Sequence, residues 1–154
     1  MDVVATYRDL IDQALPHVGA RTALWLTATF EDFVARGGTA SAPRVLIHGD
    51  VQGAHLLLDG EGRLAGAIDF GNAALTDPAL DFAGVLNCLG WRDLEQVWAH
   101  YPGVIDTDVE RRVRFYIAVQ AVYMVAYGAQ ASPTERAAGV RALAARAAAA
   151  SRRA

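Results

Sequence analysis

The sequence predicts an α+β fold: a mostly helical domain that carries one small β-hairpin. Two observations lead to this fold class. Apolar residues recur at helical spacing over most of the chain, whereas short apolar runs bounded by turn residues cluster between residues 45 and 68. The chain has 154 residues, of which 53% are hydrophobic. That length and composition fit one globular domain with one core.

Two helices are expected before the β segment, over residues 2–15 and 20–36. Each has an apolar face whose members recur every three or four positions. These residues are Leu10, Ile11, Leu15, Leu24, Leu26, Phe30, Phe33 and Val34. Gly37 and Gly38 are expected to end the second helix, and a loop then leads to Pro43.

Three short strands are expected next. Residues 45–47 form a brief apolar run, and residues 56–58 form another. A turn over residues 59–62 separates this second run from a returning strand over 64–68. The second and third strands therefore form a small hairpin.

Helix start signals mark the remainder of the chain. Asp77 is a typical N-cap with Pro78 at the first helical position, and this helix is expected to end at Gly90. A further amphipathic helix is expected over 91–101. A capping box that begins at Thr107 predicts a long helix reaching about residue 128.

A second capping box, from Ser132 to Glu135, predicts a terminal helix rich in Ala and Arg. Its last stretch, residues 147–154, is expected to fray. The chain shows no internal repeat and no linker. We therefore expect a single domain over 1–154, with its core at about 1–130 and the terminal helix over 131–154.

Composition excludes several classes of protein. The net charge of −3 does not suggest a nucleic-acid surface, and no apolar run approaches the roughly 20 residues of a membrane span. The N-terminus lacks the pattern of a signal peptide. The single cysteine, Cys88, excludes an internal disulfide and is expected to be a small core residue. These features predict a cytoplasmic protein with neither a nucleic-acid nor a membrane partner.

Residues 48–71 hold a spaced set of polar groups that is typical of phosphoryl transfer. Asp50 follows His48 and Gly49, His55 comes five residues later, and Asp69 opens a D-F-G sequence. In kinases a loop Asp accepts the proton of the attacking hydroxyl, while a ligand five residues later and the D-F-G Asp hold Mg²⁺. Because adjacent antiparallel strands lie about 5 Å apart, the three side chains can converge on one site.

Each residue also has a simpler interpretation. His48 can be a hydrogen-bonded histidine that supports the loop, and Asp50 or Asp69 alone could cap a turn. Taken together, a carboxylate and an imidazole suit a divalent ion, and a separate carboxylate can orient a hydroxyl.

Three segments resemble the aminoglycoside phosphotransferase and choline-kinase-like family of small-molecule kinases. The family pattern is H-G-D, four residues and N, then I-D-F/W, then D-P-x-x-D-L/F-A. The matching segments are 48–58, 66–71 and 77–83. The resemblance is specific over 44–86 and extends as a pattern from residue 1 to about 130. It implies the C-terminal lobe of a protein-kinase-like fold.

The resemblance also implies roles for individual residues. Asp50 is similar to the catalytic base, Asp69 to the main Mg²⁺ ligand, and Asp81 to the buried carboxylate that braces the catalytic loop. His55 stands where most of the family has Asn as second metal ligand, which is similar to macrolide phosphotransferases. The implied cofactors are Mg²⁺ and ATP or GTP as phosphate donor, and the implied partner is a small molecule with a hydroxyl group.

A kinase of this kind needs an N-terminal lobe with a Gly-rich loop and a strand Lys that hold the nucleotide phosphates. All 14 basic residues here are Arg, no G-x-G-x-x-G occurs, and only 47 residues precede His48. We therefore expect a C-terminal lobe from which the ATP lobe is absent. A separately encoded N-terminal lobe would then be a partner.

Three functions remain open at this point. The first is the catalytic lobe of a kinase for an antibiotic or a similar metabolite. The second is an inactive remnant or a binding module, and the third is a metal-dependent hydrolase. Tyr116, Tyr123 and Tyr127 on the long helix are candidate substrate-binding residues, although such residues more often belong to a core. An apolar, aromatic wall suits a macrolide better than a polycationic aminoglycoside.

Overall fold

The computed structural model describes residues 3–151. The chain divides into two compact units, which we call the helical unit and the mixed unit. The helical unit comprises Met1–Gly38 and Ala118–Ala154, and the mixed unit comprises Thr39–Ile117. Helix α5 (Val109–Ala131) has residues in both units.

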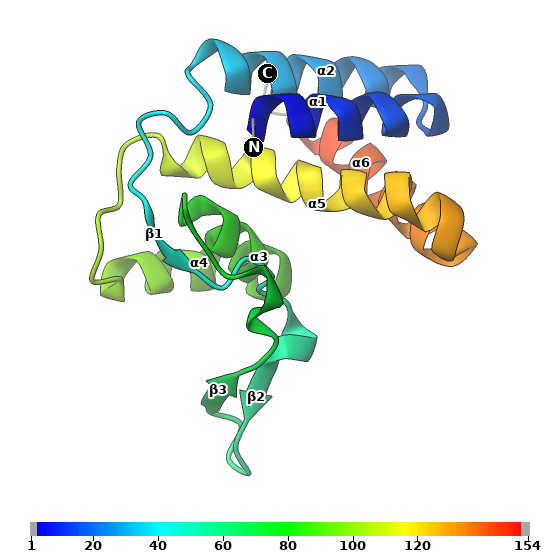
Figure 1. Cartoon of the computed structure of the whole chain (residues 1–154). Helices are drawn as coiled ribbons and strands as arrows, with labels where there is room; N and C mark the ends of the chain where they lie inside the picture. Colours follow the sequence, from blue (N-terminus) through cyan, green and yellow to red (C-terminus); the bar gives the residue numbers. More distant parts are fainter. Residues whose placement is uncertain (1–2, 152–154) are drawn as a thin grey trace. The chain divides into compact units, whose positions relative to one another are not determined.

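The helical unit contains α1 (Val3–Ala14), a short 3-10 turn η1 (Leu15–His17), α2 (Ala20–Ala35), the second half of α5, and α6 (Pro133–Ala150). Helix α2 packs beside α1 and against α6 (Figure 1). Buried apolar side chains from all four helices form its core. They include Leu10, Ile11, Leu26, Phe30, Phe33, Val119, Val122, Val125, Leu143 and Ala147.

Two expectations for the helical unit were wrong. Leu24 is 74% exposed, because it lies two positions before the buried Leu26 and therefore on the opposite face of the helix. The terminal helix continues to Ala150 rather than fraying from residue 147. Burial of Ala147 explains this continuation. The end of the expected frayed stretch, residues 152–154, lies outside the described residues.

The mixed unit contains two antiparallel pairs of strands. Strand β1 (Val45–Ile47) pairs with β4 (Ala74–Thr76), and Leu46 lies opposite Leu75. Strands β2 (Leu56–Leu58) and β3 (Leu64–Ala67) form the predicted hairpin, which projects from α3 (Ala79–Leu89) and α4 (Trp91–His100) in Figure 1. Strand β4 was not predicted, because three residues with one β-branched side chain give little signal on their own.

The helix starts in the mixed unit differ slightly from those expected. Pro78, not Asp77, is the N-cap of α3, although Asp77 Oδ1 accepts the Ala79 N–H at 3.0 Å from one position farther out. Helix α5 begins at Val109 rather than Thr107, and the Asp106 carboxylate accepts the Asp108 N–H at 3.0 Å. In the helical unit, the capping box at Ser132 is confirmed, because its Oγ accepts the Glu135 N–H at 3.3 Å.

A buried ion-pair network joins the segment before α3 to the start of α5. Arg112, only 1% exposed, donates from Nε to Asp77 Oδ2 at 2.8 Å and from Nη2 to Asp106 Oδ2 at 2.6 Å. Burial alone would lower the pKa of Arg112, but the hydrogen bonds to Asp106 and Asp77 outweigh it and raise that pKa. The hydrogen bond from Arg112 correspondingly lowers the pKa of Asp106.

Two further features bear on the sequence predictions. Cys88 is exposed, so its assignment to the core was wrong. It occupies the last turn of α3 on the side away from the buried Phe82 and Leu86. Within residues 3–151, no helix combines the length and apolar character that a membrane crossing requires.

Candidate active site

The loop that follows β1 is held by a carboxylate in the first turn of α3. The backbone N–H of His48 donates to Asp81 Oδ2, and that of Gly49 donates to Asp81 Oδ1, both at 2.8 Å. Hydrogen bonds to an ionised acceptor are roughly twice as strong as neutral ones. Asp81 therefore fixes the backbone directly before Asp50, which is the bracing role that the family resemblance implies for it.

Two glycines allow the close packing of this loop. Gly49 has φ of 82°, and a Cβ at this position would lie 2.2 Å from the backbone oxygen of Asn72. In α3, a Cβ on Gly84 would lie 2.3 Å from the oxygen of Val51. The absence of both side chains lets the loop approach the turn before β4 on one side and α3 on the other.

His48 links the loop to the end of the hairpin. Its Nδ1 lies 3.3 Å from the backbone nitrogen of Asp50. Because a backbone N–H can only donate, Nδ1 accepts this hydrogen bond. The Nε2–H then donates to the oxygen of Ile68 at 2.8 Å. The imidazole also packs on Phe70, with ring centroids 4.5 Å apart. These contacts give His48 a position that suits support of the loop.

His55 lies between the two predicted functional carboxylates. Its Nδ1 donates to the backbone oxygen of Asp50 at 2.9 Å, which leaves Nε2 with the lone pair. Nδ1 is 3.6 Å from Asp50 Oδ2, and Nε2 is 3.6 Å from Asp69 Oδ2. The His55 side chain is 14% exposed, compared with 39% for Asp50 and 61% for Asp69. The structure thus places the Asp50 and Asp69 carboxylates on either side of the His55 imidazole.

Asp69 has an unusual backbone conformation. Its φ of 64° and ψ of 62° place it in the left-handed region, alone among the non-glycine residues that the structure describes. Asp tolerates this region better than most residues, but strain of this kind costs on the order of 1 kcal/mol. A short 3-10 turn, η3 (Phe70–Asn72), follows directly. Strained residues of this type concentrate at functional sites.

His55 Nε2 and Asp69 Oδ2 are two donors that could hold a divalent cation together with ligands from outside the protein. In the described part of the chain, no group of three or more His, Cys, Asp and Glu residues is arranged to hold a metal. Mg²⁺ commonly takes only one or two protein groups and completes its shell with water and phosphate oxygens. Neighbouring ligands at about 2.1 Å from an octahedral ion lie about 3 Å apart. His55 Nε2 and Asp69 Oδ2 lie 3.6 Å apart, so these two atoms would need to move only slightly closer together to bind the same ion.

The three tyrosines do not share one environment. Tyr116 is 2% exposed beside Phe115 and is therefore a core residue rather than part of a substrate wall. Tyr123 and Tyr127 are exposed, and their rings stack at 5.5 Å. Partial burial, with a contribution from Tyr127, raises the pKa of Tyr123. These two residues belong to the helical unit, whereas the predicted catalytic residues belong to the mixed unit.

One polar residue of the site escaped prediction. The side-chain nitrogen of Gln52 lies 3.3 Å from Asp50 Oδ2 and 3.1 Å from His55 Nε2. In the sequence, Gln52 could be noticed only because it is one of the four residues between Asp50 and His55. A single Gln at that place does not indicate a role.

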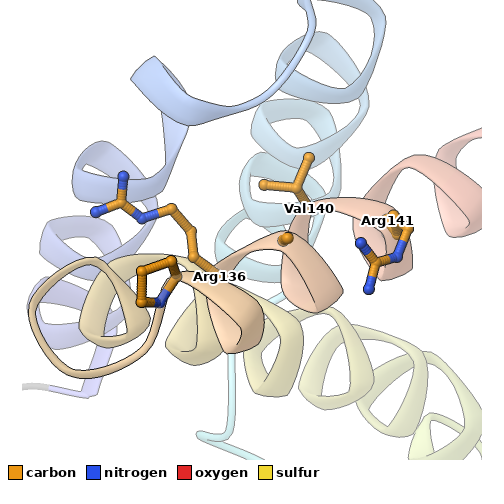
Figure 2. A pocket seen from close by; sticks show the side chains of 5 residues that line it. Arg136, Val140 and Arg141 are labelled. Carbon is orange, nitrogen blue, oxygen red and sulfur yellow. The ribbon is translucent and has the colours of Figure 1, made fainter.

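The surface also has an open hollow of about 620 Å³ on α6 (Figure 2). It is lined by Pro133, Arg136, Ala137, Val140 and Arg141. None of the residues predicted to take part in catalysis lines it. The chemistry of the side chains, rather than the size of a hollow, therefore locates the candidate site at Asp50, His55 and Asp69.

Comparison with known proteins identifies a family for the chain. The model of the Phosphotransferase enzyme family (APH) matches residues 2–116. The Bacillus subtilis (strain 168) protein YcbJ, itself uncharacterized, is 36% identical over 56 residues, which are 36% of this chain and 18% of YcbJ.

Solved structures of phosphotransferases share the fold. The GDP complex of wild-type aminoglycoside 2'-phosphotransferase-IIIa is 26% identical, with a TM-score of 0.81 over 94% of this chain and 50% of that chain. The GDP and kanamycin complex of APH(2")-IIia is 28% identical, with a TM-score of 0.81 and the same two coverages. Macrolide 2'-phosphotransferase type I, at 20% identity and a TM-score of 0.67, shares the fold over 91% of this chain and 47% of its own.

The chain thus spans about half the length of these structures. The predicted fold class, a mostly helical C-terminal lobe of a protein-kinase-like fold with small antiparallel β elements, is confirmed.

Proposed function

Because the chain belongs to the phosphotransferase enzyme family, we propose that it supplies the catalytic lobe for phosphoryl transfer from a nucleoside triphosphate to a hydroxyl of a small molecule. The observation that carries the proposal is the placement of Asp50. Its backbone is held through Asp81 and His48, and its carboxylate lies beside a histidine that also faces Asp69.

Asp50 is the proposed proton acceptor. Its Oδ2 lies near Gln52 and His55, whereas no described residue donates a hydrogen bond to Oδ1. Oδ1 can therefore receive the proton of the substrate hydroxyl as the hydroxyl oxygen bonds to the γ-phosphorus. The bond from that phosphorus to the bridging oxygen breaks, and the nucleoside diphosphate leaves.

His55 Nε2 and Asp69 are the proposed protein ligands of a divalent cation. A bound Mg²⁺ would neutralise charge on the nucleotide phosphates. The hydrogen bond from His55 Nδ1 to the Asp50 oxygen keeps the ring in the tautomer that can act as a ligand. The donor set mixes nitrogen and oxygen, which Mn²⁺ accepts more readily than Mg²⁺ does.

The nucleotide, ATP or GTP, requires a second lobe that covers it from the other side. The exposure of large apolar side chains in the hairpin region is the observation that favours contact with a second lobe. Leu57, Leu58, Leu64, Ile68 and Phe70 are between 45% and 66% exposed. Groups of exposed apolar residues commonly mark interaction surfaces. We expect the isolated chain to bind nucleotide weakly, and a separately encoded or upstream lobe would complete the site.

The proposed acceptor is a hydroxyl-bearing antibiotic. The similar structures with more than 25% identity are aminoglycoside phosphotransferases, one of them bound to kanamycin, so an aminoglycoside is our first candidate. A macrolide is the second candidate, which the His at position 55 favours. The alternative function is an inactive binding module.

The test joins this lobe to the N-terminal lobe of a competent relative and measures release of nucleoside diphosphate with a panel of both antibiotic classes. Turnover is expected, and Asp50→Ala is expected to lower it by about 10² to 10⁴-fold. The fold of the variant should be intact, because the Asp50 side chain is 39% exposed. A chimera that binds nucleotide but turns over no acceptor would favour the binding module.

A further inference from the structure

Gln52 occupies the space between the proposed base and the proposed cation ligand. Its side-chain nitrogen is within 3.5 Å of three polar atoms: Asp50 Oδ2 and both ring nitrogens of His55. We infer that Gln52 is a positioning residue that holds the Asp50 carboxylate and the His55 ring in one arrangement. The inference rests on the proposed function for the roles of Asp50 and His55.

The distances show how the amide meets the ring. The Gln52 nitrogen is 3.1 Å from His55 Nε2 and 3.4 Å from Nδ1. A donor aligned with the Nε2 lone pair in the ring plane would lie much farther from Nδ1 than from Nε2. The nearly equal distances therefore place the amide over the face of the imidazole, as in an N–H···π contact.

This placement leaves the Nε2 lone pair free. Nδ1 is occupied by the Asp50 backbone oxygen at 2.9 Å, and the Gln52 amide covers one face of the ring. The hydrogen bond at Nδ1 and the amide on the ring face together restrict rotation of the imidazole. Its Nε2 remains 3.6 Å from Asp69 Oδ2. Groups that orient a ligating histidine raise metal affinity because the ligand is already in place.

The same amide acts on the base. At 3.3 Å from Asp50 Oδ2, its N–H favours one oxygen of the carboxylate and leaves Oδ1 directed to the acceptor. The backbone of Gln52 is itself held, since its oxygen accepts the His55 N–H at 2.9 Å at the start of a short 3-10 turn, η2 (Gly53–His55). One side chain therefore links proton acceptance to cation binding.

Two substitutions separate positioning from simple packing. Gln52→Leu keeps the size of the side chain but removes the N–H groups. Gln52→Glu also removes them, but adds a carboxylate near Asp50 and His55. Gln96→Leu is the matched control, because Gln96 is an exposed residue of α4 in the same unit.

The first measurement needs no metal. Nuclear magnetic resonance of the full chain should show the Nδ1–H of His55 in slow exchange with water in the wild type and in Gln96→Leu. In Gln52→Leu the uncovered ring should lose this proton measurably faster. A Gln52→Leu chain whose Nδ1–H exchanges at the wild-type rate would overturn the positioning role.

The second measurement uses Mn²⁺ alone, followed by paramagnetic broadening at residues 50–69. Gln52→Leu should weaken Mn²⁺ binding by about tenfold, whereas Gln52→Glu should bind at least as tightly as the wild type. Turnover of the two-lobe chimera should fall in both. Equal Mn²⁺ affinity for wild type and Gln52→Leu would contradict the inference. Unchanged Mn²⁺ binding by Asp69→Ala would instead refute the cation site of the proposed function.

Discussion

The loop that carries Asp50 and the hairpin that leads to Asp69 are held in different ways. The loop donates two backbone hydrogen bonds to the Asp81 carboxylate and packs against α3 and Asn72. The hairpin is held mainly by its own strand pairing, and most of its large apolar side chains are exposed. The difference shows that the loop with the proposed proton acceptor is held by hydrogen bonds and packing within the mixed unit, whereas the hairpin beside the proposed cation ligand leaves most of its large apolar side chains exposed.

The largest stability effect is expected at the buried ion-pair network of Arg112, Asp77 and Asp106. Arg112→Ala would leave Asp77, which is 1% exposed, as a buried carboxylate without its partner. Removing one member of a buried ion pair costs about 3–5 kcal/mol of unfolding free energy. Urea unfolding followed by circular dichroism measures this loss.

Arg114→Ala is the matched control on the same helix. Arg114 is 45% exposed, pairs with Glu110 and lies over the Trp91 ring at 4.3 Å. Exposed pairs and cation–π contacts contribute only about 0.5–1 kcal/mol. Equal losses for the two arginine variants would show that the buried network does not support the mixed unit.

A somewhat smaller loss is expected for Asp81→Ala. This change removes the acceptor of two backbone N–H groups, each bond to a charged group being worth about 1.5–3 kcal/mol. Water replaces part of these hydrogen bonds, so we expect a loss of about 3 kcal/mol of unfolding free energy and faster hydrogen exchange at His48 and Gly49.

Asp59→Ala gives the comparison in the hairpin. Its carboxylate also accepts two backbone N–H groups, from Glu61 and Arg63, and these bonds lower its pKa. The Asp59 side chain is 31% exposed in a hairpin turn, so water replaces part of the lost bonds, and its loss should be smaller than that for Asp81→Ala. An Asp59→Ala effect as large as that of Asp81→Ala would remove the distinction between loop and hairpin.

These residues also show what the sequence could and could not predict. Local signals worked: the Ser132 cap, the helix that begins after Pro78 and the β2–β3 hairpin all depend on residues within a few positions of one another. Partners that lie far apart in the chain were missed. Strand β4 pairs with β1 across the whole site segment, and Arg112 meets Asp77 from a different helix.

The residues of the candidate site show the same contrast between local signals and distant partners. The order of Asp50, His55 and Asp69 was readable as a motif, and the role of Asp81 came only from the family resemblance. Gln52 carried no signal, because its effect depends on the three-dimensional position of its amide over the His55 ring. Leu24 was assigned to an apolar face by its spacing, and Cys88 was expected to be a core residue, but both are solvent-exposed.

Two glycines with nearly the same backbone conformation sharpen the comparison further. Gly49 in the loop has φ of 82° and Gly62 in the hairpin turn has φ of 78°. An alanine at either position carries about 1–2 kcal/mol of left-handed strain. At Gly49 the new Cβ would also lie 2.2 Å from the Asn72 oxygen, whereas nothing lies within 4 Å at Gly62.

Gly49→Ala should therefore destabilise the protein by at least about 1 kcal/mol more than Gly62→Ala. Thermal unfolding of the two variants measures the difference, and the chimera should lose turnover only with Gly49→Ala, because the loop must shift to admit the methyl group. Equal melting temperatures for the two variants would mean that the loop accommodates the added methyl group as easily as the hairpin turn does.

The smallest effect on stability is expected at the exposed leucines of the hairpin. Leu58 and Leu64 are paired across β2 and β3 and are 64% and 66% exposed. Replacing both with Thr keeps strand propensity and should change the unfolding free energy by no more than about 0.5 kcal/mol. The same double variant should bind a separately produced N-terminal lobe more weakly, because the apolar area available for burial is reduced. Isothermal titration with that lobe measures the change. If the double variant is less stable but binds the lobe as tightly as the wild type, the two leucines stabilise the hairpin itself. That outcome would contradict the proposal that the hairpin surface contacts an N-terminal lobe.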